Sequence, residues 1–168
     1  MTLIGAINSG SRKILFADRL WNLSEFKEKR KIFVDNEDNY LAVSGFILKR
    51  LITEFEENLR NKSVKSLIKS SYKNTNLPGT SFINYNQTED SLQVYLVNNN
   101  KIESFKIINY IFLGFQVNEL EGFDFRDVDH TLIPTLRKQH EKYPDYIGNT
   151  FDVLVLQNKA PIWMNVNF

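Results

Sequence analysis

Cysteine is absent from this chain of 168 residues, which excludes a disulfide scaffold, thiolate zinc sites and a cysteine nucleophile. Long apolar runs are absent as well, since no stretch approaches the ~18 consecutive apolar residues of a membrane-spanning helix. The segment 1–15 lacks the charged start, apolar run and cleavage site of a secretory signal. We therefore expect a cytoplasmic protein.

Charge of one sign is not in excess either. The chain has 21 Lys and Arg against 20 Asp and Glu, so no overall field favours nucleic acid or an anionic membrane as a partner. The only two histidines, His130 and His140, are ten residues apart, which disfavours a histidine-dependent triad. The acidic group around Asp124 to Asp129 matches no metal-binding loop, and the glycines are too scattered for a phosphate loop. We expect no metal and no cofactor.

Hydrophobic periodicity gives the order of the secondary structure. Short apolar runs bounded by turn residues predict strands, and stripes of period 3.6 predict helices. A helix at 131–142 tolerates Pro134 only near its first turn. Strands and helices segregated in this way indicate a single α+β domain over residues 1–168. The strands are expected at 2–7, 13–17, 31–34, 40–44, 81–85, 92–97, 101–107, 110–113, 150–156 and 161–168, and the other two helices at about 46–59 and 63–73.

Four short groups in the first 45 residues carry a resemblance. They are Thr2 beside the initiator methionine, Ala17-Asp18-Arg19 at the end of the second expected strand, Lys31-Ile32 at the start of the third, and Ser44-Gly45 before a helix. None is specific alone. Their order and spacing together resemble the proteasome β-subunit family of N-terminal nucleophile hydrolases, which includes a bacterial ring peptidase that works with an ATP-driven unfoldase.

The resemblance implies a four-layer αββα sandwich of two stacked antiparallel sheets and a threonine peptidase that cleaves through an acyl-enzyme. Removal of Met1 would make Thr2 the amino terminus, with its hydroxyl as nucleophile and its α-amine as base. The family implies that Lys31 lowers the pKa of this amine, that Asp18 orients Lys31, and that the backbone N–H of Gly45 faces the oxyanion. It also implies a homo-oligomeric ring, peptide or unfolded-protein substrates and an ATP-dependent unfoldase.

The second half of the chain departs from the family pattern. Gly114-Phe115-Gln116 stands where the family has Gly-Ser-Gly, and in the later Asp-x-x-Ser-Gly-Gly pattern Asp145 is kept while Gly148 replaces the serine. In the family, the two serines and the aspartate of these patterns help to hold the amine of the threonine. In this chain, Asp145 is the one of the three that is kept.

Other interpretations of the same residues stay open. By position, Leu20, Val43 and Ile47, with Lys29, would line the pocket for the substrate residue before the cleaved bond, but the apolar ones suit a core equally well. Asp18 also suits a turn cap, Lys31 an exposed strand start, and Gly45 a crowded strand–helix junction. Three other functions are open: a catalytically silent assembly subunit, a small-amide amidohydrolase, and an unrelated α+β binding domain.

Overall fold

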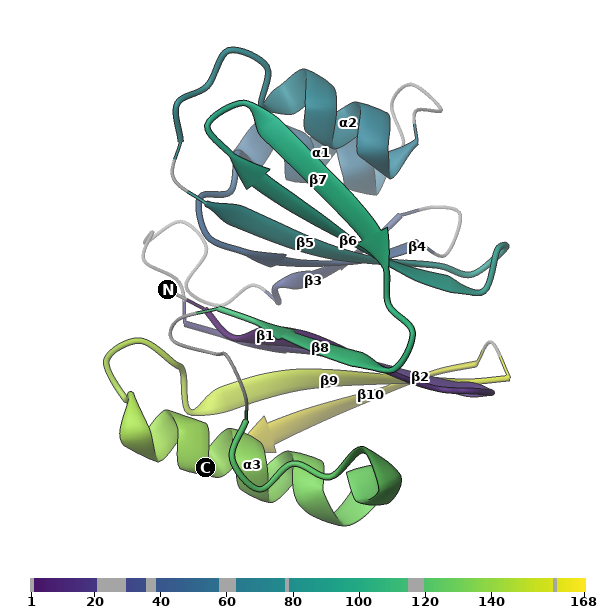
Figure 1. Cartoon of the computed structure of the whole chain (residues 1–168), viewed down its shortest axis with the longest axis vertical. Helices are drawn as coiled ribbons and strands as arrows, with labels where there is room; N and C mark the ends of the chain where they lie inside the picture. Colours follow the sequence, from purple (N-terminus) through teal and green to yellow (C-terminus); the bar gives the residue numbers. More distant parts are fainter. Residues whose placement is uncertain are drawn as a thin grey trace.

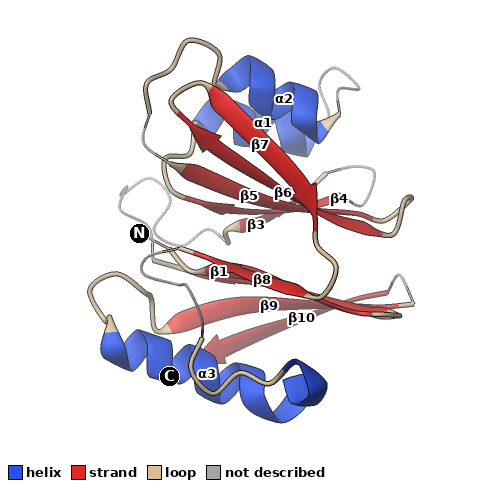
Figure 2. Ribbon diagram, in the orientation of Figure 1, coloured by secondary structure: helices blue, strands red, loops and turns tan. Residues whose placement is uncertain are grey.

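The structure is a computed structural model, and it describes residues 2–20, 30–35, 39–57, 63–77, 79–114, 120–158 and 160–168. Two antiparallel sheets organise these residues (Figures 1 and 2). The first sheet has the order β10-β9-β2-β1-β8, and the second has the order β3-β4-β5-β6-β7. The strands of the first sheet are β1 (Ile4–Ser9), β2 (Arg12–Asp18), β8 (Tyr110–Leu113), β9 (Thr150–Gln157) and β10 (Ala160–Asn167). Those of the second are β3 (Ile32–Val34), β4 (Asn39–Ser44), β5 (Thr80–Asn86), β6 (Ser91–Asn98) and β7 (Lys101–Lys106).

Helices cover the outer face of each sheet, as Figure 1 shows. Helices α1 (Lys49–Glu57) and α2 (Val64–Ser71) pack on the second sheet, and α3 (Val128–Lys142) packs on the first, preceded by the short 3₁₀ turn η2 (Phe125–Asp127). The layers are therefore helices, sheet, sheet and helix. The predicted α+β class and αββα sandwich are confirmed.

Three apolar layers fill the spaces between these elements. The central layer lies between the sheets and contains small residues from the first sheet, such as Ala6 and Ala17, opposite Tyr40 and Tyr85 from the second. The layer under α3 is rich in aromatic residues, including Phe16, Phe112 and Phe151. The layer under α1 and α2 includes Leu41, Val43 and Phe82. Strands buried on both faces explain why β1, β2 and β4 read as nearly continuous apolar runs.

Two local predictions need correction. The strand expected at 2–7 runs from Ile4 to Ser9, two residues later at each end, and the first hairpin therefore turns at Gly10 and Ser11. Helix α3 begins at Val128, so Pro134 is in its interior and not near its first turn. Pro134 and His130 both lie on the exposed side of α3, where water can satisfy the His130 carbonyl that proline deprives of its helical partner.

Within the described residues, no helix has both the length and the apolar character needed to cross a membrane. The compartment and the assignment of residues 1–168 to one domain stay predictions.

Candidate functional site

The polar cluster lies where three segments meet at one end of the sandwich. Thr2 precedes β1, Asp18 is the last residue of β2, and Lys31 immediately precedes β3. All three are buried, with exposed fractions of 5%, 0% and 1%. Backbone hydrogen bonds fix them in place: Asp18 N donates to Leu3 O at 3.0 Å, and Val43 N donates to Lys31 O at 3.0 Å. The structure thus brings together three of the predicted catalytic residues, from segments that enter two different sheets.

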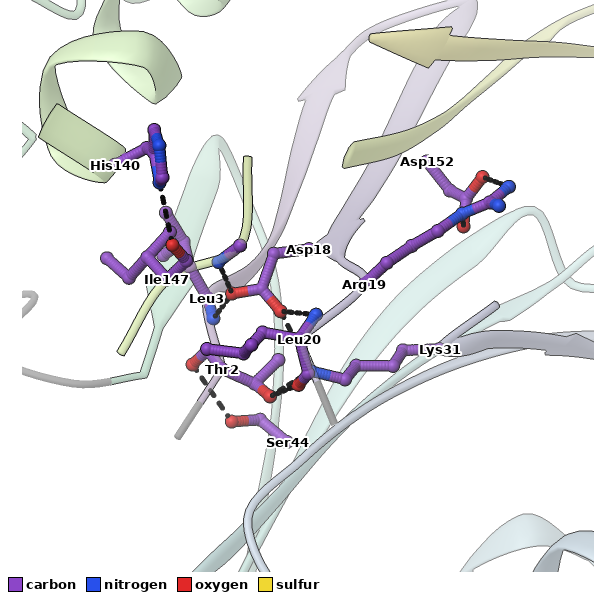
Figure 3. A network of polar contacts seen from close by, with 11 residues as sticks. Thr2, Leu3, Asp18, Arg19, Leu20, Lys31, Ser44, His140, Ile147 and Asp152 are labelled. Atoms are coloured by element: carbon purple, nitrogen blue, oxygen red, sulfur yellow. Dashed lines mark hydrogen bonds and ion pairs between the residues drawn. The ribbon is translucent and has the colours of Figure 1, made fainter. Parts of the chain in front are cut away.

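Lys31 is the centre of this cluster (Figure 3). Its Nζ donates hydrogen bonds to Oγ1 of Thr2, to the carbonyl oxygen of Leu20, and to Oδ1 of Asp18 at 2.8 Å. An ammonium group has three N–H donors, so each of them has an acceptor here. The side chain points into the protein and toward Thr2, which excludes the alternative of an exposed strand start.

Asp18 is surrounded by donors. Besides the ammonium, Oδ2 accepts the backbone N–H of Leu3 at 2.9 Å and, at a longer 3.4 Å, that of Gly148, while Oδ1 accepts the N–H of Leu20 at 3.2 Å. A protonated carboxyl would direct its own O–H at groups that can only donate. Three of these donors are backbone N–H groups, which cannot accept a hydrogen bond, so the pattern favours the carboxylate form of Asp18.

Burial is the main electrostatic influence on both partners. It lowers the pKa of Lys31 below its ordinary value, and the adjacent Asp18 carboxylate opposes this. Burial also raises the pKa of Asp18, against the charge and hydrogen bond of Lys31 and the N–H groups of Leu3 and Gly148. The pair is consequently held together by charge inside a desolvated site, where each group depends on the other to remain ionised.

The Thr2 backbone is held by two contacts that the sequence did not reveal. Ser44 Oγ donates to the carbonyl oxygen of Thr2 at 3.2 Å. On the other side, Gly114 has a φ of 149°, and a Cβ atom there would overlap the same carbonyl oxygen. Ser44 belongs to the Ser44-Gly45 motif and Gly114 to the Gly114-Phe115-Gln116 motif. These two motifs were the sequence signal that could have indicated the contacts with Thr2. Phe115 itself lies outside the described residues.

Gly45 has a structural requirement for glycine. Its φ is 96°, and a Cβ atom would overlap the carbonyl oxygen of Gly79. The open interpretation of a crowded strand–helix junction is therefore correct, and the oxyanion role stays a prediction.

Asp145 is not part of the cluster. It lies exposed in the loop after α3 and, within the described residues, forms no hydrogen bond or ion pair with Thr2, Asp18 or Lys31. Gly148, and not Asp145, contacts the cluster, through Asp18. The Ile147–Gly148 peptide group donates its N–H to Asp18 and accepts at its oxygen from His140 Nδ1, 2.8 Å away (Figure 3). A Cβ atom at Gly148 would lie 3.0 Å from Leu20 N, so a serine there would require Leu20 to shift by a few tenths of an ångström.

The comparisons agree with this picture at the level of the fold. No family model and no curated protein matches the sequence. Among solved structures, the Gly-1 mutant of Anbu from Hyphomicrobium sp. strain MC1 matches with a TM-score of 0.67 and 8% sequence identity, over 99% of this chain and 87% of that chain. The chain has the N-terminal nucleophile hydrolase fold. At such low identity the likeness shows the fold alone.

The resemblance to the proteasome β-subunit family was wrong as a family assignment. No family model matches, and the structural likeness to Anbu, at 8% sequence identity, does not show membership of the β-subunit family. The four short sequence matches each lie at the end or start of a strand. These matches specify where strands end around a polar cluster. That arrangement is a feature of the fold, so the matches do not identify one family among those that share the fold.

The residues predicted to line the substrate pocket have different environments, and one of them, Val43, belongs to the core. Val43 is fully buried under α1 and α2, and Ile47 packs on the same apolar layer, so the alternative of core packing is correct for Val43. Leu20 is half-buried, and its backbone oxygen and nitrogen bind Lys31 and Asp18. Lys29 lies outside the described residues.

The acidic group before α3 serves the helix. Asp124 caps η2 by accepting the N–H of Arg126 at 2.9 Å, and Asp127 pairs with His130 at 2.7 Å. Across the described segments, no three His, Cys, Asp or Glu side chains converge as metal ligands would.

Proposed function

We propose that this protein is an N-terminal threonine hydrolase that cleaves peptide bonds through an acyl-enzyme. The observation that carries the proposal is the Lys31 ammonium, which donates to Oγ1 of Thr2 while it is paired with the buried Asp18. A hydroxyl that a buried cation contacts is stabilised as it gains negative charge during attack on a carbonyl. The fold shared with Anbu supports the same conclusion, since it is that of N-terminal nucleophile hydrolases.

The chemistry needs a free Thr2 amine, so we propose that Met1 is removed. Oγ1 of Thr2 then forms a bond to the substrate carbonyl carbon while its proton moves to the Thr2 amine. The C–N bond breaks as that proton passes to the leaving nitrogen, and an ester on Oγ1 remains. A water molecule, deprotonated by the same amine, attacks the ester and releases the carboxylic acid product, which restores the hydroxyl.

Lys31 has a second effect, on the base. The α-amine has an ordinary pKa of ~7.7–8.0, and a nearby like charge disfavours its protonation. Because the cluster is buried, the influence of the ammonium is weakly screened. The amine would therefore be neutral, and able to accept a proton, near neutral pH.

Covalent trapping tests the proposal. A peptide β-lactone or epoxyketone is expected to add to the Met-free chain, and peptide mapping by mass spectrometry is expected to place the adduct on Thr2. Thr2→Ala should abolish the adduct and Thr2→Ser should keep it. Thr53→Ala is the matched control, because Thr53 is an exposed threonine on α1 whose hydroxyl donates to Lys49 O of the same helix. A Met-free, folded wild-type chain that stays unlabelled would contradict the proposal.

A catalytically silent relative is the second candidate, and the exposed position of Asp145 favours it. The same labelling experiment separates the two. Hydrolysis of small amides but not peptides would instead indicate a small-amide amidohydrolase. Ring assembly and an ATP-dependent unfoldase stay predictions, to be tested by light scattering and by copurification.

A further inference from the structure

A second charged cluster adjoins the site and includes the residues that flank its ion pair. Arg19 follows Asp18 in the chain, and Arg30 precedes Lys31. Both side chains converge on Asp152 of β9. Arg19 makes a bidentate contact, with Nε at 2.8 Å and Nη2 at 2.6 Å from the two carboxylate oxygens, and Arg30 Nε lies 3.7 Å from Oδ1.

Asp152 is itself buried, with 1% of its surface exposed. It shares a face of β9 with Leu154 and Leu156 of the layer between the sheets. A third donor, Asn165 Nδ2 of β10, reaches it at 3.4 Å. A buried carboxylate is retained only where its charge is compensated, and here two guanidinium groups provide that compensation.

The two arginines are anchored differently. Arg19 also donates its backbone N–H to Thr150 O at 2.9 Å, so both its backbone and its side chain are bound to β9. Arg30 lies over the ring of Trp163 on β10, with its Cζ 4.5 Å from the ring centroid. Asp152 therefore links the end of β2 to the segment entering β3, and thus the first sheet to the second.

This link matters because the catalytic pair lies at strand ends. Asp18 is the last paired residue of β2, and Lys31 comes before the first paired residue of β3, Ile32. Backbone hydrogen bonds hold each of these residues in its own sheet, but β2 and β3 belong to different sheets, so no strand pairing sets the separation between them. Figure 3 shows the Arg19–Asp152 contact beside the Asp18–Lys31 pair, on the side away from His140.

We propose that Asp152 is a positioning residue: by binding Arg19 and Arg30 it fixes the two segments that carry Asp18 and Lys31, and so sets the approach of Lys31 to Thr2. The effect on turnover rests on the proposed function. Asp152→Asn releases both arginines and shifts this geometry. It is expected to lower kcat by about 10- to 100-fold, the cost of a displacement near 1 Å, with KM close to its wild-type value.

A pH profile separates positioning from plain destabilisation. Loss of the Asp152 carboxylate lets Lys31 move away from Thr2, so the Thr2 amine loses the influence of the nearby ammonium and the ascending limb of kcat/KM should move to higher pH. Asp152→Glu keeps the negative charge, so its ascending limb of kcat/KM should lie at the wild-type pH. The matched control is Asp90→Asn, which breaks the contact between Asp90 and the buried Lys13, 3.3 Å apart. Lys13 is five residues from Asp18 along β2, about 16 Å away, so this control should leave kcat and the profile unchanged.

A measurement without turnover keeps the two proposals distinguishable. The ¹³Cε signal of Lys31, followed by NMR, should titrate at lower pH in Asp152→Asn than in the wild type and in Asp90→Asn. If the wild type is unreactive toward the trapping reagent but the Lys31 titration moves to lower pH in Asp152→Asn, the proposed function fails and the positioning role holds. A folded Asp152→Asn chain with wild-type kcat overturns the positioning role. So does a Lys31 titration that does not move, or an equal loss of kcat in Asp90→Asn.

Discussion

Lys31 and Asp18 form a buried ion pair between segments of two different sheets, with Nζ 2.8 Å from Oδ1. Such a pair contributes little net stability, because the cost of desolvating both charges offsets their attraction. Its presence in the interior is better explained by the position it gives the ammonium, beside the hydroxyl of Thr2. The sandwich thus holds a positive charge beside the hydroxyl that we propose as the nucleophile.

Breaking this pair should be more harmful than removing it. Asp18→Asn leaves the buried ammonium without its counter-ion and should lower the free energy of unfolding by about 3–5 kcal/mol. The double variant Asp18→Asn/Lys31→Met removes both charges, so it should lose clearly less than the sum of the two single variants. Urea unfolding of the wild type and the three variants measures this coupling. Losses that add to within about 0.5 kcal/mol would show that the two side chains are independent.

Gly114 should tolerate no side chain. In Gly114→Ala the new methyl group meets the Thr2 carbonyl oxygen and the Leu3 Cα, and the φ of 149° is strained for alanine. We expect a loss of stability of about 2–4 kcal/mol from overpacking and backbone strain together, with weaker labelling of Thr2 in the chains that remain folded. Thermal unfolding and the trapping rate are the measurements.

Gly79→Ala is the control for that experiment, because a Cβ atom at Gly79 has no neighbour within 4 Å and its φ is not positive. It should change stability little. Equal losses in the two variants would show that contact with Thr2 is not what Gly114 provides.

Tyr72 should make the fold sensitive to alkaline pH. Burial raises the pKa of Tyr72 from 10.0 to about 12, and its hydroxyl donates to Phe46 O at 2.6 Å. Because the pKa is higher in the folded state, the stability that Tyr72 contributes is complete below pH 10 and is lost as pH rises toward 12. That loss amounts to about 3 kcal/mol. Unfolding by urea at pH 8 and pH 11.5 should therefore show a smaller decline in Tyr72→Phe than in the wild type. An identical decline in both chains would contradict the assignment.

The strands could be read from the sequence to within one or two residues because their signals are local. Alternating or continuous apolar runs between turn residues such as Gly10 and Asn99 need no tertiary information. Helix α3 was less accurate, since its start depends on η2 and on Asp124 as a cap, and Pro134 biased the prediction toward a later start. Asp145 was placed in the site by its position in a motif, but the path of an exposed loop follows from how α3 docks on the first sheet. The motif contains no such information.

The sequence by itself determined the alternation of strands and helices and the placement of Thr2, Asp18 and Lys31 at strand ends, because periodicity and turn chemistry act over a few residues. Only the tertiary structure decided that these three side chains meet, that Val43 is buried in the core, and that Arg19 and Arg30 share Asp152. Those outcomes depend on how two sheets stack, and contacts between residues distant in the chain fix that stacking.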